Sequence, residues 1–277
     1  MKYRKKSKNS NQEYFEFNTM HEIADFVAEN KYNTNEFFKN RSNDLSSLRT
    51  NSKRGFNLIG FDESVEFLKN GWDEGSKKLK NATKIANSNQ QTFRSEYNVV
   101  GGNCSVPRYL QGIPTNMILQ KRIEKKQKLV NVYKSVGYSS MWSADQILVE
   151  ARKLIEIVQQ IELNGYRTNI YVLLGADGRR DEKVCVKLKV KSSNERLNLK
   201  KISFSLMHPD FLRRILLKLI EIDPIAINGS WDAYGYPLDN EGNVREKYSE
   251  IFNFEKNDVF VPIKVENIDK FIKSLNI

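Results

Sequence analysis

The sequence has few of the residues that build metal centres and disulfide frameworks. It contains 2 cysteines and 2 histidines in 277 residues, and Cys104 and Cys185 lie too far apart along the chain to form a ligand pair. Two isolated cysteines are reduced thiols by default, which excludes a disulfide-rich scaffold. We therefore predict no metal site and no cofactor.

Long apolar runs are also missing. No run approaches the roughly 18 residues that a helix needs to span a bilayer. The lysine-rich start is followed by Asn, Gln and Glu rather than by the apolar core of a signal peptide. We expect a soluble, intracellular protein that has no membrane partner.

Acidic side chains are outnumbered: there are 34 against 45 basic ones, which gives a formal charge of +11. Such an excess favours acidic partners such as nucleic acid, although a lysine- and asparagine-rich composition also follows from an AT-rich genome. The segment KRIEKKQK concentrates this charge directly before a predicted strand. Cations there could contact phosphates, or they could protect an edge strand from aggregation. The candidate nucleic-acid-binding residues are Lys121, Arg122, Lys125, Lys126 and Lys128.

The segment from Leu129 to Val190 organises the predicted fold. Its hydrophobic pattern predicts a short buried strand, a long amphipathic helix and two further strands. Ser143 stands three residues before Gln146, as in a capping box, and Asn164-Gly165 is a helix stop signal. A crossover of this length joins parallel neighbours in a sheet.

The N-terminal part is predicted to be mainly helical. Helical spacing covers residues 20–29, and a helix, a tight turn and a second helix are expected between Asp62 and Leu79. In the turn, Trp72 is interpreted as an aromatic plug rather than a ligand contact. Residues 98–116 are rich in Gly and Pro, which predicts an irregular loop with one helical turn at Pro107. The turn motif comprises Gly71, Trp72, Glu74 and Gly75.

No group of side chains has the spacing of a known catalytic or phosphate-binding motif. His208 and Asp210 are the most tempting pair, yet Pro209-Asp210 also makes a good helix start. The acids Asp177, Asp181 and Glu182 lack the spacing of a calcium loop. Trp231, Tyr234 and Tyr236 either stack on bases or cover a sheet edge. We assign no catalytic residue.

The last third of the chain should complete the sheet. Residues 209–222 have helical spacing, and the charged residues Arg213, Arg214 and Lys218 are expected to point to solvent. Residues 258–264 are predicted to form an edge strand, because Pro262 cannot donate a ladder hydrogen bond. A terminal helix follows it. The predicted buried stripe of the helix at residues 209–222 is Leu212, Ile215, Leu216, Leu219 and Ile222.

Four segments together resemble an uncharacterised protein family found mainly in tailed bacteriophages. They begin FDESVEFLKNGWDEG, VGGNCSVPRYLQGIPTNMI, LVNVYKSVGYSS and LNLKKISFSLMHPD, and they span about residues 61–217. The resemblance implies a phage or prophage origin, in the host cytoplasm or the virion, and no assigned activity. The central part also looks like a von Willebrand A-type domain. That resemblance implies a divalent-cation site after the first strand, but NVYKSVGYSS has no aspartate to provide it.

The predicted fold class is α/β, with a three-layer, mostly parallel sheet and flanking helices, von Willebrand A-like or Rossmann-like. The expected organisation is a basic, disordered tail at 1–12, a mainly helical and loop region at 13–127, and an α/β core at 128–277. The expected function is non-enzymatic binding, to a phage or host protein, to copies of itself, or to nucleic acid. The alternative is an enzyme with a dispersed site, such as a hydrolase or nuclease.

Overall fold

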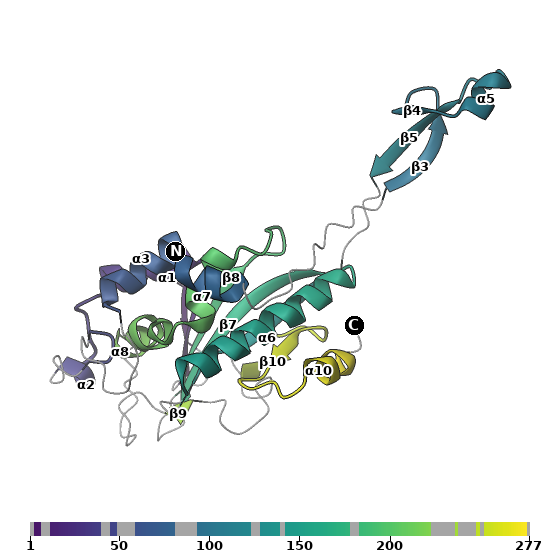
Figure 1. Cartoon of the computed structure of the whole chain (residues 1–277). Coiled ribbons are helices and arrows are strands. Elements are labelled where there is room, and N and C mark those ends of the chain that lie inside the picture. Colours follow the sequence, from purple (N-terminus) through teal and green to yellow (C-terminus); the bar gives the residue numbers. More distant parts are fainter. Residues whose placement is uncertain are drawn as a thin grey trace. The chain divides into compact units, whose positions relative to one another are not determined.

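The computed structural model divides the chain into two compact units (Figure 1). Unit 1 comprises Met1–Ile85 and Leu129–Ile277, and unit 2 comprises Ala86–Lys128. The structure describes residues 3–6, 12–39, 45–48, 59–80, 93–122, 128–138, 142–177, 183–222, 236–237, 248–249 and 252–275.

The predicted strand, helix and strand form the centre of unit 1. β6 (Leu129–Ser135) leads through α6 (Ala144–Leu163) to β7 (Arg167–Asp177), and β8 (Lys183–Lys191) returns beside β7. The capping box of Ser143 and Gln146 is present, and Gly165 has a φ of 87° where the helix ends. β6 and β7 are parallel, and β7 and β8 are antiparallel, which confirms the prediction for this segment.

The central sheet extends beyond this segment at both edges. Within the described residues its strand order is β1-β2-β8-β7-β6-β10, and β9 (Tyr236–Pro237) pairs with the end of β7. β10 (Val259–Val261) is the predicted C-terminal edge strand and runs parallel to β6. At the other edge, β2 (Gln12–Phe17) is parallel to β8, and β1 (Tyr3–Lys6) is antiparallel to β2. Part of the basic segment for which the sequence predicted a disordered tail is therefore a strand.

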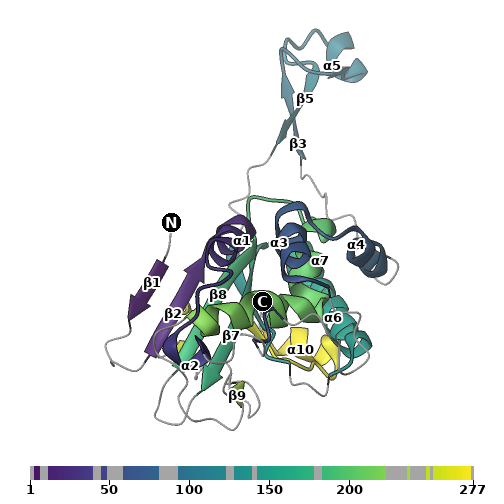
Figure 2. The same ribbon diagram turned by 90° about the vertical axis from the view of Figure 1, so that its left-hand side faces the viewer.

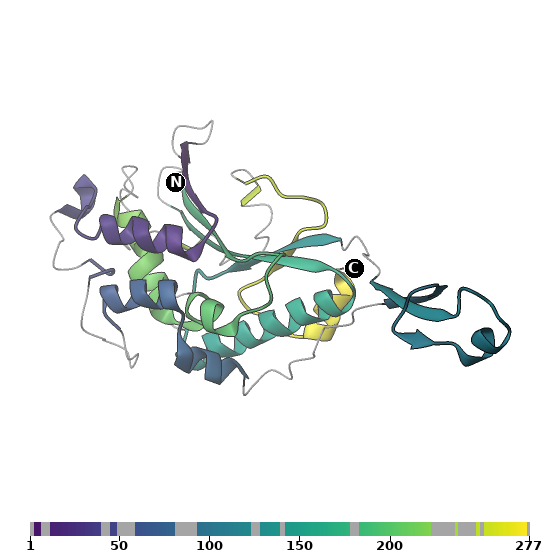
Figure 3. The ribbon, with the colours of Figure 1, turned by 90° about the horizontal axis from the view of Figure 1, so that it is seen from above.

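The two faces of the sheet have different side chains and different covers. Alternate residues such as Val132, Val172 and Val186 belong to the main apolar core. α6, α7 (Leu199–Met207) and α10 (Ile268–Ser274) lie on this side of the sheet (Figures 2 and 3). On the opposite face Tyr133 stacks on Tyr171, with ring centroids 5.0 Å apart. There the cover is the segment that contains the buried residues Tyr248 and Phe252.

The N-terminal helices of unit 1 follow the sequence prediction. α1 (Met20–Glu29) packs against α3 (Phe61–Asn70), which is followed by α4 (Asp73–Lys80), while α2 (Glu36–Lys39) is a single turn. Trp72 lies in the turn between α3 and α4, and its backbone N–H donates to the backbone carbonyl of Lys200 in α7 at 3.0 Å. A Cβ on Gly75 would lie 2.2 Å from the Trp72 ring, so only glycine allows this close packing. The motif fixes the turn against α7.

One prediction for the helix at residues 209–222 is wrong. Arg214 is 1% exposed and Lys218 is 0% exposed, although both were expected to point to solvent. The first part of this helix is the π-helix η2 (Phe211–Leu216), followed by α8 (Leu217–Ile222). The predicted apolar residues Ile215, Leu216 and Leu219 are buried as expected. The charged residues beside them are buried as well, because this helix is enclosed on more than one face.

Unit 2 is a small antiparallel sheet. β5 (Met117–Arg122) lies between β3 (Phe93–Asn98) and β4 (Asn103–Cys104). The helical turn predicted at Pro107 is α5 (Val106–Leu110). The prediction of an irregular loop at 98–116 is wrong in part, because β4 lies within it.

The structure confirms the α/β fold class with a mostly parallel sheet flanked by helices. The sequence placed residues 13–127 in one region, whereas residues 86–128 form their own unit and the preceding residues belong with the core. Among the helices that the structure describes, none combines the length and the apolar character needed to cross a membrane.

Candidate functional site

His208 and Asp210, the pair that the sequence singled out, lie side by side where α7 ends. His208 Nδ1 accepts a hydrogen bond from the Asp210 backbone N–H at 3.1 Å. The imidazole packs edge-on against the Trp72 ring, with ring centroids 4.7 Å apart. Burial lowers the pKa of His208 to about 4, and nearby Lys78 adds to this effect. The imidazole is therefore neutral at pH 7. It serves here as a packing group and a backbone acceptor.

Asp210 begins a row of four buried charged side chains that the sequence analysis missed. Burial raises the pKa of Asp210 to about 6, while its hydrogen bond from Ile59 N–H at 2.7 Å and the Arg214 guanidinium oppose the shift. Lys218 and Glu221 continue the row along η2 and α8, with Nζ and Oε2 3.3 Å apart. All four side chains are 0–1% exposed.

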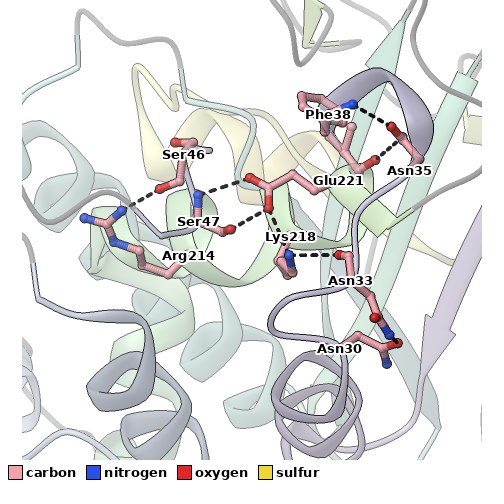
Figure 4. Close-up of polar contacts among 10 residues, drawn as sticks. Asn30, Asn33, Asn35, Phe38, Ser46, Ser47, Arg214, Lys218 and Glu221 are labelled. Atoms are coloured by element: carbon pink, nitrogen blue, oxygen red, sulfur yellow. Dashed lines mark hydrogen bonds and ion pairs between the residues drawn. The ribbon is translucent and has the colours of Figure 1, made fainter. Parts of the chain in front are cut away.

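The row holds the segments that precede α3 (Figure 4). Arg214 donates to Ser46 O, and Lys218 donates to Asn33 O at 3.1 Å. Glu221 accepts from the N–H of Ser47 at 3.1 Å and from its hydroxyl at 2.5 Å. These bonds are directed at the chain's own backbone and at one serine. We interpret the row as an internal anchor for residues 33–35 and 46–47, because none of its side chains has a surface that a substrate could reach.

The other sequence candidates are not gathered into a site. Asp177 ends β7, whereas Asp181, Glu182, Trp231 and Tyr234 lie outside the described residues. Glu74 of the turn motif is exposed and pairs with Lys78 at 2.7 Å. Within the described part of the chain, no three His, Cys, Asp or Glu side chains come close enough to hold a metal ion.

The basic cluster begins in unit 2. Lys121 and Arg122 end β5, and Lys128 is exposed where unit 2 ends, whereas Lys125 and Lys126 lie outside the described residues. The Lys121 ammonium is 2.5 Å from Glu96 Oε1 but its side chain remains 61% exposed. Unit 2 has seven basic and two acidic side chains in its sequence, so its balance is strongly positive.

Unit 2 also carries most of the exposed apolar side chains. Of the ten large hydrophobic residues that are exposed in the described chain, six lie in this unit, with 53–78% of their surface exposed. None of the described side chains between residues 95 and 121 is buried. A folded unit normally buries such residues in a core of its own. We call these six the apolar surface: Tyr97, Val99, Val100, Val106, Tyr109 and Leu110.

Local contacts fix the shape of this surface. The Arg108 guanidinium lies over the Tyr97 ring at 4.2 Å and donates to Thr115 O at 3.0 Å, which joins α5 to β3. Gly101 allows the chain to approach β5, because a Cβ there would lie 2.4 Å from Ile118 O. The apolar surface is thus held by specific contacts, although none of the described side chains between residues 95 and 121 is buried. Sequence reasoning missed it because isolated valines in a Gly-rich segment carry no periodic signal.

A comparison with protein families matches residues 5–272 to the domain of unknown function DUF7192. The chain belongs to this family. No curated protein and no solved structure matches the chain. The match runs from unit 1 across the residues of unit 2 and back into unit 1.

Replacing Glu221 by Gln should lower the free energy of unfolding by about 3 kcal/mol, because Lys218 would remain buried without its anion. Urea unfolding followed by circular dichroism measures this change. Glu74→Gln is the matched control: it removes an exposed pair at the same type of short helical spacing and should cost about 0.5 kcal/mol or less. Equal effects of the two substitutions would contradict the anchor interpretation.

Replacing His208 by Gln should make stability fall with pH. The lowered pKa of His208 means that its imidazole binds fewer protons in the folded state than in the unfolded state between pH 4 and 6.5, so this group alone makes stability rise with pH. Asp210, with its raised pKa, contributes the opposite slope between about pH 4 and 6. In the wild type, the two contributions to the slope of stability against pH nearly cancel. Without His208, the free energy of unfolding should fall by up to about 3 kcal/mol from pH 4 to 6.

Urea titrations of both proteins across this pH range measure the two slopes. His21→Gln, at an exposed position of α1, is the control and should leave the wild-type profile unchanged. Parallel profiles for the wild type and His208→Gln would show that the buried ring does not control this proton balance.

Proposed function

We propose that the chain is a non-enzymatic binding protein in which unit 1 is the scaffold and unit 2 makes the contact with another protein. The observation that carries this proposal is the apolar surface. Six large apolar side chains exposed on a unit that buries none of its described residues are expected where a partner completes the packing. A partner would bury side chains that the unit cannot bury alone.

The chemistry of the surface favours a protein over a nucleic acid as the partner of this region. Val99, Val100, Val106 and Leu110 are aliphatic, and an aliphatic side chain neither stacks on a base nor pairs with a phosphate. Protein interfaces have apolar centres with polar rims.

Nucleic-acid binding through the basic cluster is the second candidate. It is favoured by the exposure of Lys121 and Lys128 and by the positive balance of unit 2. This contact would be electrostatic and independent of base sequence, because lysines contact phosphates rather than base edges.

We also propose that the protein comes from a tailed phage or prophage and lies in the host cytoplasm or the virion. The segments that begin FDESVEFLKNGWDEG, VGGNCSVPRYLQGIPTNMI, LVNVYKSVGYSS and LNLKKISFSLMHPD support this origin. The parallel β6-α6-β7 crossover supports a relationship of the core with von Willebrand A-type domains.

A photo-reactive amino acid at position 110 tests the protein contact. We expect ultraviolet light to cross-link the full chain to one protein in infected or lysogenic cells, because Leu110 is 78% exposed and belongs to the apolar surface. Mass spectrometry identifies the product, and binding is then measured with both purified proteins. The control position is 149 on α6, where Val149 is 43% exposed but lies in unit 1.

Three results would contradict the proposal. They are equal cross-linking from both positions, cross-links only to nucleic acid, and cross-links only to unit 1 of the same chain.

A salt titration tests the second candidate. Replacing Lys121, Arg122, Lys125, Lys126 and Lys128 by Gln should weaken binding to DNA or RNA and flatten its dependence on salt, because fewer counterions are released. Fluorescence anisotropy with labelled single and double strands measures both quantities. Leu110→Ser is the control and should bind nucleic acid as the wild type does. Unchanged affinity of the five-residue variant would remove the basic cluster as a nucleic-acid site.

A further inference from the structure

The strand β3 of unit 2 has one edge that no strand in the described part of the chain covers. On its other side it pairs with β5, in a register without a bulge over all 6 residues. Prolines and bulges keep many edge strands from pairing with another chain. β3 contains neither, so its free edge can accept a further strand.

Antiparallel pairing of β3 with a second copy of itself is restricted to a few registers. Successive residues of a strand direct their backbone N–H and C=O groups alternately toward the two neighbouring strands. Two opposed residues must both direct these groups toward the new partner, so their residue numbers are both odd or both even. The two registers of this kind with the longest overlap are centred on Ser95 and on Glu96.

Charge selects between these two registers. In the register centred on Ser95, each Arg94 lies opposite the Glu96 of the other copy, and each Phe93 lies opposite a Tyr97. Opposite charges and aromatic pairs that face each other across two strands stabilise their pairing. In the register centred on Glu96, two carboxylates oppose each other, which is unfavourable. The sequence of β3 is therefore complementary to itself when Ser95 is the centre.

The described side chains of this strand remain accessible to a second copy. Ser95 is exposed, Glu96 is 34% exposed and Tyr97 is 53% exposed. Glu96 contacts Lys121 through Oε1, but a carboxylate accepts more than one donor.

The net charge of unit 2 opposes contact between copies, because seven basic side chains stand against two acidic ones. Salt at about 0.15 M screens exposed charges that are more than about 8 Å apart. The pairs that lie directly across the contact then decide its register.

We propose that two copies of the chain associate through the free edges of β3, with the two strands antiparallel and Ser95 opposite Ser95 on a two-fold axis. Such a contact is isologous, since each copy contributes the same residues. The inference goes beyond the proposed function, because it joins copies of the chain. It uses the edge of β3 rather than Leu110 and the other aliphatic residues of the apolar surface.

A charge exchange tests the pairing. Sedimentation velocity of the full-length protein at about 0.15 M salt measures association over a range of concentrations, and we expect a monomer–dimer equilibrium. Glu96→Arg places two cations opposite each other at both pairs and should weaken dimerisation by about tenfold or more. Adding Arg94→Glu to this variant restores opposite charges and should recover the affinity. Position 94 also lies opposite Lys121 in β5, so an opposite charge is restored within the unit as well.

Cysteines at two positions test the register. In a Cys104→Ser background, which removes the exposed native thiol, Ser95→Cys should form a disulfide between copies under mild oxidation. Directly opposed residues have Cβ atoms about 4.5–5.5 Å apart, close to disulfide geometry. Gln120→Cys is the control: Gln120 is exposed and lies opposite Ser95 on β5. In the proposed dimer the two copies of position 120 are three strand spacings apart, about 14 Å, and should not cross-link.

The outcomes separate this inference from the proposed function. A monomer at every concentration would overturn the β3 contact and leave the apolar contact with another protein standing. Dimerisation that Glu96→Arg does not change, or equal cross-linking from positions 95 and 120, would assign the association to another surface and overturn β3 as the site. Weakening in Glu96→Arg without recovery in the double variant would overturn the register. Circular dichroism checks that each variant folds, and the cysteine pair tests the same contact without a change of charge.

Discussion

Four charged side chains without access to water impose the main constraint on unit 1. A buried charge is tolerated only when it is paired and hydrogen-bonded, so Asp210, Arg214, Lys218 and Glu221 need partners inside the protein. They find them in each other and in the segments near Asn33, Ser46 and Ile59. The helix that carries them is 150 residues or more beyond these segments in the sequence. The constraint therefore joins the beginning of the chain to its last third.

The parts of unit 1 that could be predicted are those with local signals in the sequence. The β6-α6-β7 segment was predictable because its caps, its periodicity and its strand composition are local signals that agree. The row on η2 and α8 was not, because this helix is enclosed on more than one face, and Arg214 and Lys218 are buried beside apolar residues such as Leu219. A search for one apolar face assigns Arg214 and Lys218 to solvent. Their carbonyl and carboxylate partners lie far away in the sequence and give no local signal.

Unit 2 escaped prediction for a different reason. Strands are recognised in sequence by a buried face, and β3 and β5 have no buried residue among those described. β3 and β5 pair in a regular antiparallel register, in which Glu96 lies opposite Leu119, without a buried apolar face among their described residues. Without a buried face, these strands carry no alternating apolar pattern in the sequence. In the structure, the same property leaves large apolar side chains of unit 2 exposed.

The structure also separates the positive charges that are enclosed in the fold from those that are exposed. Several cations of unit 1 are enclosed and donate to backbone carbonyls: Lys134 to Ile263 O at 2.8 Å, Lys191 to Thr168 O at 2.9 Å and Lys218 to Asn33 O. These side chains are 0–3% exposed, so they hold the fold together and cannot contact a phosphate or a partner's carboxylate. A net charge read from sequence counts them equally with the exposed Lys121 and Lys128. Contact with a phosphate depends on the exposed cations, and for this reason the substitutions that test it belong in unit 2 rather than in the core.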